Sequence, residues 1–564
     1  MSRFVRPSKY RHVYGEKSKR TYENAKISGS AWDTDLVSAG GKYLAVNWQV
    51  SGGGAFAILP AFSPFNAPEP AGFPLKLPDI LPLARGHTAP VLDTAWSPFH
   101  DDLVVSGGED GKICVWKIED SLFEGWGEDH WQPEDLSAKS KLNAGGRKVG
   151  QVIFHPTASH VLASASGDHL IRLWDIENGQ DASITLKGHG DSIQSLCWNT
   201  VGTTLATTCR DKKLRLFDPR AGTDAVRVAD GHSGVKGSRV VWLGDRDRIA
   251  TTGFSRMSDR QVGLWNTSDL SNIEMNSLDS SAGVLMPFFA EGNDVLFLAG
   301  KGDGNIRYYE YEGDSLHSLN EYKSSEPQRG MTFLPRRALD VGQNEIARAF
   351  KLAGGGIEPL SFIVPRKAES FQSDIFPPAN SIEPALSASD FFAGKTARPK
   401  VIDLETRAVS TSEGPIPSAP SGTATPSAAP SLPPSETAKS KSAPADYAPP
   451  TKEEPKPTPK QLEPEPVPVP SPAPAPVERE PDVQAKSLEI EQPESDDETP
   501  IRTPPKEEPA PALQAAPEAS SNETVTALVL EKIVMAPILE VEDLEATARG
   551  EGGFGSTGGF GKKA

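Results

Sequence analysis

Short runs of alternating apolar and polar residues fill the first 365 positions of the chain. The runs VLDTAW (91–96), LVVSGG (103–108) and KICVWKI (112–118) alternate with a period of two, and Gly, Asp and Asn residues separate such runs. Alternation over a few residues between turn-forming residues is typical of β-strands joined by tight turns. The pattern therefore predicts an all-β fold for this part of the chain.

A longer repeat organises these predicted strands. Five segments each place an aspartate six residues before an aromatic side chain. The pairs are Asp110 and Trp116, Asp168 and Trp174, Asp211 and Phe217, Asp259 and Trp265, and Asp303 and Tyr309. The aromatic residues follow one another at intervals of 58, 43, 48 and 44 residues, so the first interval contains an insertion within residues 121–146. Periods of this length are typical of repeats that each form one small sheet.

Other polar residues accompany this repeat. Gly-His pairs precede three of the aspartates, and a hydroxyl residue stands four positions before three of them. These residues are His87, His189 and His232, and Ser106, Ser164 and Thr207. The pattern resembles the WD40 repeat and predicts a buried His–Asp–Ser–Trp hydrogen-bond network. A hydrolase triad would use the same residue types, but it is needed only once. We therefore predict a structural network, no catalytic residues and no enzyme.

The repeat also predicts the architecture. Residues 41–60 and 330–365 alternate like strands without the full signature, and we assign them to divergent first and last repeats. With the measured period, residues 30–365 predict a seven-bladed WD40 β-propeller. Such a ring leaves only short strand edges exposed. We expect a strand from the N-terminal segment to complete the last blade.

Composition changes abruptly after this region. Residues 410–520 contain 28 prolines, 19 acidic and nine basic side chains, and Tyr447 is their only aromatic residue. A segment so poor in apolar groups cannot offset the entropy lost on ordering. We therefore predict a disordered Pro/Glu/Ser-rich linker over residues 406–522, which carries most of the net charge of −18.

Several classes of site are disfavoured. Cys114, Cys197 and Cys209 are too scattered for a disulfide framework or a zinc site, and no metal or cofactor is predicted. The Gly-rich run at 51–56 lacks the Gly-Lys-Ser/Thr of a phosphate loop and is interpreted as a hairpin turn. No apolar run reaches 18 residues, and the N-terminus lacks a secretion signal, so we expect no membrane partner.

The N-terminal arm, residues 1–29, is strongly basic. Its cations alternate with Phe4, Tyr10, Tyr14 and Tyr22, which could anchor the arm while the charges face outward. The cations are Arg3, Arg6, Lys9, Arg11, Lys17, Lys19, Arg20 and Lys26. From charge alone a solvated surface, a nucleic-acid partner and an acidic protein partner all stay open.

Longer segments resemble the coronin family. They include MSRFVRPSKYRHVYG at the N-terminus, YENAKISGSAWD, SPFHDDLVVSGGEDGKICVW, EPQRGMTFLPRRALDV and FIVPRK, and the resemblance covers about residues 1–405. It implies that residues 366–405 form an extension packed against the underside of the propeller. It also implies binding to filamentous actin, regulation of branching through the Arp2/3 complex, and a cytoplasmic location at the cortical actin cytoskeleton, with no nucleic-acid partner.

The resemblance also suggests where actin would bind. The family has a basic residue before the first blade, commonly arginine, and Lys26 occupies that position here. Lysine keeps the charge but lacks the bidentate fork of arginine. The whole candidate set is Lys26, Lys19, Arg20, Arg6, Lys9, Arg11, Lys212, Lys213 and Arg215. Lys212 and Lys213 lie in a predicted turn, where their side chains should be exposed.

The C-terminus departs from the coronin pattern. No sustained heptad repeat follows residue 520, so we predict a monomer. Residues 523–564 instead resemble the C-terminal arm of trimeric deoxyuridine triphosphatases, which implies that Phe554 would stack on uracil, with Arg549, Ser556 and Thr557 near the phosphates. The catalytic barrel and magnesium-binding groups of that family have no counterpart here. The alternatives to actin binding are a general WD40 scaffold for a multiprotein complex and dUTP-related nucleotide binding by this tail.

Overall fold

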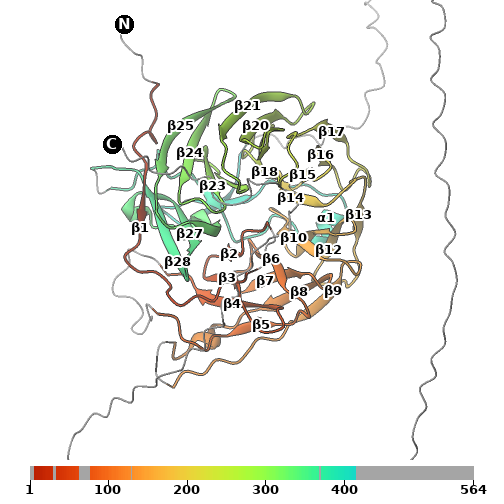
Figure 1. Ribbon diagram of the computed structural model, residues 1–564, viewed down its shortest axis with the longest axis vertical. Coiled ribbons are helices and arrows are strands. Elements are labelled where there is room, and N and C mark those ends of the chain that lie inside the picture. The colour runs from red at the N-terminus through yellow and green to blue at the C-terminus, as the bar shows by residue number, and fades with distance from the viewer. Residues whose placement is uncertain are drawn as a thin grey trace, which may run out of the picture. The chain divides into compact units, whose positions relative to one another are not determined.

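The computed structural model describes residues 6–29, 33–62, 76–126, 128, 130–367 and 370–413. The strands of these residues form seven four-stranded antiparallel sheets and one three-stranded sheet. The four-stranded sheets stand in a ring around a common centre (Figure 1). The all-β prediction is confirmed. Residues 414–564, which hold most of the predicted linker and Arg549, Phe554, Ser556 and Thr557 of the predicted arm, lie outside the described residues.

Six of the sheets are formed by four consecutive strands. The first contains β2 (Val37–Ala39), β3 (Tyr43–Asn47), β4 (Ala55–Pro60) and β5 (Leu83–Arg85). The second contains β6 (Val91–Trp96), β7 (Leu103–Gly108), β8 (Lys112–Lys117) and β9 (Ser140–Asn143). The third contains β10 (Val149–Phe154), β11 (Val161–Ser166), β12 (Ile171–Asp175) and β13 (Ile184–Leu186). The insertion expected within residues 121–146 therefore lies between β8 and β9, and it contains the 3-10 helix η1 (Asp120–Phe123).

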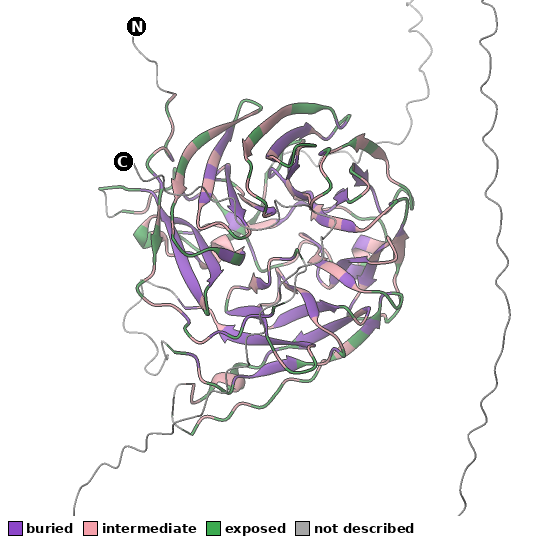
Figure 2. Ribbon diagram, viewed as in Figure 1, coloured by how far each residue is buried: buried purple, intermediate pink, exposed green. Residues whose placement is uncertain are grey.

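The next three sheets repeat this order. The fourth contains β14 (Ile193–Trp198), β15 (Leu205–Cys209), β16 (Lys213–Phe217) and β17 (Arg227–Asp230). The fifth contains β18 (Arg239–Trp242), β19 (Arg248–Phe254), β20 (Arg260–Asn266) and β21 (Asn272–Asp279). The sixth contains β22 (Leu285–Ala290), β23 (Val295–Gly300), β24 (Ile306–Glu312) and β25 (Ser315–Tyr322). The second and third strands of each sheet are mostly buried and the fourth strands partly exposed (Figure 2), because apolar side chains of adjacent sheets pack against one another.

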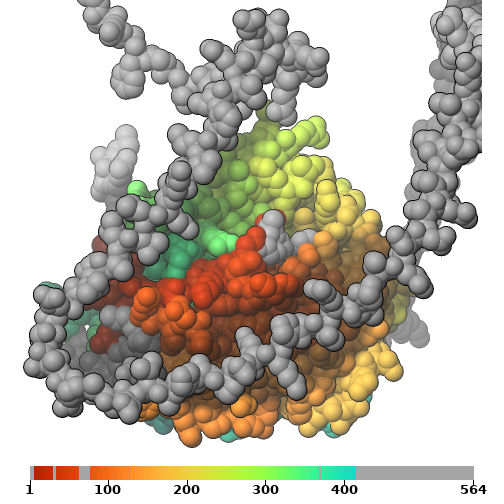
Figure 3. Space-filling view, turned by 60° about the horizontal axis from the view of Figure 1, so that its bottom comes forward, coloured from red at the N-terminus to blue at the C-terminus, as the bar shows by residue number. Residues whose placement is uncertain are grey.

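The seventh sheet joins the two ends of the ring. It contains β26 (Gln328–Phe333), β27 (Glu345–Ala353), β28 (Gly356–Ile363) and, from the N-terminal arm, β1 (Tyr14–Lys17). β1 pairs antiparallel with β28, with Tyr14 opposite Ile363 and Lys17 opposite Leu360. The pairing covers the edge of β28, which would otherwise expose unpaired backbone groups. The N-terminal residues thus meet the last sheets on the surface, as predicted (Figure 3).

Antiparallel strands send their turns alternately to the two ends of each sheet. We call the upper face the end that carries the turns between second and third strands and the connections between sheets. The lower face carries the other turns. Because β1 runs from the lower to the upper face, residues 6–13 lie toward the lower face and residues 18–29 on the upper face.

The C-terminal extension covers the lower face. Its small sheet contains β29 (Ala379–Asn380), β30 (Lys400–Ile402) and β31 (Val409–Thr411), so this sheet continues past the expected end at residue 405. Its helix α1 (Ala388–Phe392) begins with a capping box between Ser387 and Asp390. The Phe391 ring lies 4.5 Å from the His155 ring, which is buried below the third sheet. The extension therefore packs on the ring as the resemblance implied.

One sheet contains the complete predicted polar network. In the second sheet His87 Nδ1 donates to Asp110 (2.9 Å), and His87 Nε2 lies 2.8 Å from Ser106 Oγ. Trp116 Nε1 donates to the same Ser106 oxygen (2.9 Å). Burial alone would raise the pKa of Asp110, but hydrogen bonds from His87 and from two backbone amides lower it to about 2. The network ties the connection before β6 to the turn between β7 and β8.

The other sheets differ from this prediction. In the third, Ser164 still binds Trp174 (2.9 Å), but Asp168 pairs with Arg172 (2.6 Å). In the fourth, His189 binds Thr207 (3.0 Å), whereas Asp211 pairs with Arg215 (2.6 Å). An arginine of the third strand reaches the aspartate in both cases. Arginine offers a carboxylate two parallel N–H groups, so it replaces histidine as the partner.

The fifth sheet departs in another way. Thr251 accepts from Trp265 (2.7 Å) and lies 2.9 Å from His232, but the other His232 nitrogen faces Gln261 (3.4 Å). Asp259 instead accepts a hydrogen bond from Ser255 (3.1 Å). The reason is the turn between β19 and β20. Fourteen residues separate Thr251 from Trp265, whereas ten separate Ser106 from Trp116, and the longer turn carries Asp259 away from the histidine.

The networks lead to a stability prediction. Ser106→Ala removes the partner of both His87 and Trp116, so it should lower the free energy of unfolding by about 2–4 kcal/mol. Ser164→Ala is the matched control, because that serine holds only Trp174 and should cost about 1–2 kcal/mol. Urea unfolding followed by tryptophan fluorescence measures both. Equal losses in the two variants would contradict the proposed role of His87.

Candidate interaction face

Lys26 stands on the upper face in a segment fixed to the first sheet. Its carbonyl accepts a hydrogen bond from the Gln49 amide (2.7 Å), and the Ser28 amide donates to the Asn47 carbonyl (2.8 Å). The neighbours Ala25 and Ile27 are buried, whereas the Lys26 side chain is exposed. Within the described residues no carboxylate lies within salt-bridge distance of its ammonium group. The charge is therefore displayed from a rigid base.

Buried tyrosines hold the arm in place. The Tyr22 hydroxyl donates to the Pro60 carbonyl (2.7 Å), and its ring lies 4.7 Å from that of Phe62. Tyr10 is 1 % exposed, and Asn293 donates to its hydroxyl oxygen (2.9 Å). Tyr14, by contrast, is 41 % exposed on β1. Two of the four predicted anchors are thus buried, and Phe4 lies outside the described residues.

The basic residues of the arm are divided between the two faces. Lys19 is exposed and Arg20 half-buried, and both lie with Lys26 on the upper face. Arg6, Lys9 and Arg11 precede β1 and lie toward the lower face. This division follows from the course of β1, and a single flat partner cannot contact both groups.

Two of the lower cations are occupied by contacts within the chain. Arg6 forms salt bridges with Glu310 and Glu312 of the sixth sheet. The Lys9 ammonium contacts the Asp374 carbonyl of the extension and lies 5.2 Å from the centre of the Tyr10 ring. These contacts attach the arm to its surroundings, so they give Arg6 and Lys9 a structural role.

The three cations predicted near the fourth sheet also differ from one another. Lys212 is exposed at the turn between β15 and β16, where its φ is 65°, and its ammonium donates to the Ser233 carbonyl (2.8 Å). Lys213 pairs with Asp230 (2.5 Å). Arg215 is only 7 % exposed and binds both oxygens of Asp211 (2.6 and 3.0 Å). Arg215 therefore belongs to the interior of the sheet, and we remove it from the candidate binding residues.

Two further cations stand on the upper face and belong to no predicted motif. Lys236 lies in the connection between β17 and β18, and Arg256 lies in the long turn between β19 and β20. Exposed Val235 and Met257 stand beside them. The signal that could have revealed this group is the length of the turn FSRMSD, because Thr251 stands eight residues before Asp259, whereas the corresponding hydroxyl residue of the second sheet, Ser106, stands four before Asp110.

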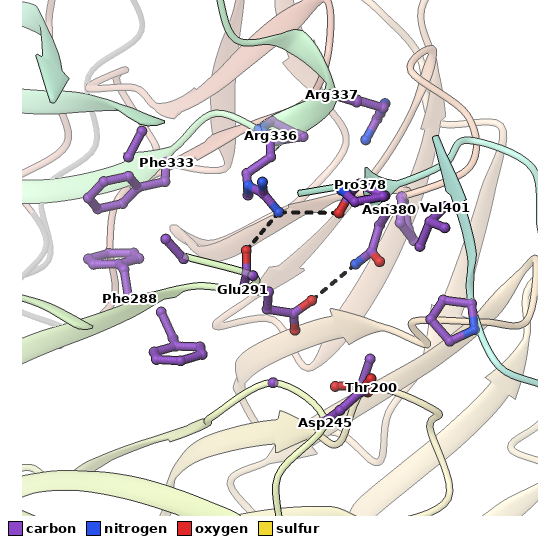
Figure 4. Close-up of a pocket in the computed structure, with 18 of the residues that line it drawn as sticks. Thr200, Asp245, Phe288, Glu291, Phe333, Arg336, Arg337, Pro378, Asn380 and Val401 are labelled. Atoms are coloured by element: carbon purple, nitrogen blue, oxygen red, sulfur yellow. Dashed lines mark hydrogen bonds between the residues drawn. The ribbon is translucent and has the colours of Figure 1, made fainter. Parts of the chain in front are cut away.

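A large cavity lies on the lower face, between the ring and the extension (Figure 4). Its volume is about 1060 Å³, and Phe288 and Phe333 supply part of its apolar wall. The Arg336 guanidinium donates to the carbonyls of Glu291 (2.7 Å) and Pro377 (2.9 Å), and Asn380 donates to the Glu291 carboxylate (3.3 Å). Burial raises the pKa of this carboxyl group. These polar groups join the extension to the ring.

The described residues contain neither a metal-binding cluster nor a helix that could span a bilayer. In the described ranges no group of three His, Cys, Asp or Glu side chains is placed to hold a metal ion. Burial raises the pKa of the Cys114 and Cys197 thiols to about 12, so neither is a reactive thiolate at neutral pH. No helix in the part of the chain that the structure describes is long and apolar enough to span a bilayer.

Comparisons with known proteins give consistent results. Models of the "WD domain, G-beta repeat" match residues 80–117, 140–175 and 181–218, a "Type of WD40 repeat" matches 357–399, and "Domain of unknown function (DUF1899)" matches 3–64. The chain is 50 % identical over 411 residues to "Coronin-like protein crn1" of Schizosaccharomyces pombe, covering 72 % of this chain. It spans 65 % of that relative's length, just under two thirds.

Two further matches cover more of the other protein. "Coronin-A" of Dictyostelium discoideum is 41 % identical over 410 residues, which are 72 % of this chain and 87 % of that protein. Among solved structures, the WD40 domain of Toxoplasma gondii coronin superposes with a TM-score of 0.64 at 30 % identity, covering 70 % of this chain and 97 % of that domain. The matches therefore reach the N-terminal arm, the ring and the extension.

The contrast between Arg215 and Lys212 gives a second prediction. Arg215→Met leaves the Asp211 carboxylate without its cation inside the sheet, so the free energy of unfolding should fall by about 2–3 kcal/mol. Lys212→Met on the neighbouring exposed turn should change it by less than about 0.5 kcal/mol. Thermal and urea unfolding of both variants test this. A stable Arg215→Met protein would return this residue to the candidate binding set.

Proposed function

This chain belongs to the coronin family, and on that basis we propose that it binds actin filaments through the upper face of its ring. The observation that carries the proposal is the placement of Lys26. Its side chain is exposed and without a carboxylate partner in the described residues, on a segment held by backbone hydrogen bonds to the first sheet. A basic residue at this position is what the family resemblance assigns to filament contact.

Electrostatics supports this partner. Actin filaments are acidic, so unpaired cations on a rigid surface can steer the ring to a filament and hold it there. Lys19, Lys26 and Lys212 are exposed on the upper face, and none of them has a salt bridge within the described residues. A rigid ring loses little conformational entropy on binding, which favours affinity. Binding of this kind should weaken as salt is added.

The candidate residues do not contribute equally to the proposed site. Arg20 and Lys213 stay in it as half-buried flanking residues, and Lys213 already pairs with Asp230. Arg6, Lys9 and Arg11 lie toward the opposite face, and we assign them no filament contact. The proposed site therefore centres on Lys26, with Lys19 and Lys212 as further contacts.

The wider role is part of the same proposal. We assign the protein to the actin cytoskeleton at the cell cortex, as a monomeric, non-enzymatic filament-binding protein that influences Arp2/3-dependent branching. The family membership supports this role. The acidic run at 494–498 resembles segments that contact the Arp2/3 complex, and it lies outside the described residues.

A charge-reversal pair tests the site. Lys26→Glu should raise the Kd for filaments about tenfold in a cosedimentation assay at physiological salt, because it places a negative charge against an acidic partner. Arg11→Glu makes the same kind of change toward the lower face and should alter Kd less than about twofold. If both variants pellet like the unaltered protein, Lys26 is not a contact. If Arg11→Glu alone loses binding, the lower face is the site.

A further inference from the structure

The two most exposed large apolar side chains in the described residues lie on neighbouring loops of the upper face. Met257 is 83 % exposed and Val235 is 72 % exposed, whereas Ile80, the next in order, is 63 % exposed. Val235 belongs to the connection before β18, and Met257 to the turn between β19 and β20. Single exposed apolar residues are common, but two together on adjoining loops indicate a contact surface.

These two loops are fixed to each other. The Gly234 amide donates to the Phe254 carbonyl (2.7 Å), and a Cβ at Gly234 would stand 2.6 Å from that of Phe254. The Lys236 ammonium lies 4.7 Å from the centre of the Phe254 ring. The approach is close enough to require glycine, so the loops hold Val235 in one place relative to the turn.

The turn that carries Met257 is also rigid. The Ser255 amide donates to the Asp259 carbonyl (2.8 Å), and the Ser258 amide donates to the Ser255 carbonyl (3.0 Å). The Ser255 hydroxyl accepts from the Met257 amide (3.1 Å) and donates to the Asp259 carboxylate (3.1 Å). Asp259 thus stabilises this turn in place of the histidine contact that its position in the repeat predicted. These hydrogen bonds keep the Met257 side chain exposed to solvent.

Cations surround the two apolar side chains. Lys212, Lys236 and Arg256 have no salt bridge to a carboxylate within the described residues. The neighbouring Arg210 guanidinium lies 4.0 Å from the Asp191 carboxylate. Lys212 reaches the Val235 loop directly through the Ser233 carbonyl. We call Lys212, Val235, Lys236, Arg256 and Met257 the fifth-sheet patch. An apolar centre with a charged rim is the usual composition of a protein interface.

We propose that the fifth-sheet patch is a second contact with the actin filament, on the same face as Lys26 but distant from it around the ring, and that Lys212, already assigned to filament contact above, acts as part of this second contact. This inference rests on the function proposed above. The charge of the rim selects an acidic partner, and the shared face allows one filament to reach both places. Val235 and Met257 would supply apolar burial that the lysine contact lacks, and their rigid loops would lose little entropy on binding.

The experiment removes the apolar centre and leaves every charge in place. The full-length Val235→Ser/Met257→Ser variant should bind filaments about tenfold more weakly in cosedimentation, with an unchanged salt dependence because the cations are retained. Arg256→Glu should also weaken binding, and here the salt dependence should change. The matched control is Ile382→Ser/Val409→Ser, which removes two exposed apolar side chains from the extension and should pellet normally. Thermal unfolding confirms that each variant is folded.

The outcomes separate the two proposals. If Val235→Ser/Met257→Ser binds like the unaltered protein while Lys26→Glu loses binding, the second contact is wrong and the proposed function stands. If the unaltered protein does not pellet with filaments in dilute buffer, both are wrong. If the double variant pellets normally but abolishes self-association in light scattering, the patch is a contact between copies of this chain, and the inference is overturned.

Discussion

The pairing of β1 with β28 is the constraint on which the rest of the structure depends. Sheets arranged in a ring leave one strand edge open unless the two ends of the chain meet. Here the N-terminal strand provides the outer edge of the seventh sheet, and a salt bridge between Lys17 and Glu358 joins the two strands. The same strand carries the chain from the lower face to the upper face. Ring closure therefore decides which N-terminal cations stand on which surface.

The two faces use their charged residues differently. On the lower face, Arg337 pairs with Asp101 (2.5 Å), Arg398 pairs with Asp245, and Arg220 donates to Thr396 of the extension (2.7 Å). These arginines join the extension to the ring and link the seventh sheet to the second. On the upper face, Lys26 and Arg256 have no such partner in the described residues. The lower-face arginines are used in intramolecular contacts, whereas Lys26 and Arg256 on the upper face are available to a partner.

The sequence predicted the fold well because the same pattern of strands and Asp-to-aromatic spacing occurs in several repeats. The spacing of Asp110 and Trp116 recurs in later repeats and identifies the sheets, and the resemblance placed the extension on the underside. The site was harder to predict because the contacts of a side chain cannot be inferred from its position in the sequence. Arg215 follows a turn, yet it is buried against Asp211. Arg6 and Lys26 belong to one basic segment, yet they reach opposite faces.

The predicted histidine–aspartate pair of the repeat was also wrong where a turn is longer than in the other repeats. The six-residue spacing of Asp259 from Trp265 suggested a histidine partner, but the insertion lies between Thr251 and that aspartate, and so moves it out of reach. Val235 and Met257 carry no motif. Their exposure depends on the close approach of two loops at Gly234. Sequence patterns do not predict a contact between loops that are distant in the chain.

Closure by the N-terminal strand has a consequence for synthesis in the cell. Lys17 and its partner Glu358 are 341 residues apart in the sequence. β1 is therefore synthesised well before β28, the strand with which it pairs. At typical elongation rates this delay is roughly 17 to 70 seconds. During that interval the nascent chain carries an unpaired β1 and a growing row of sheets with an open edge, and unpaired strand edges of this kind readily pair with other chains.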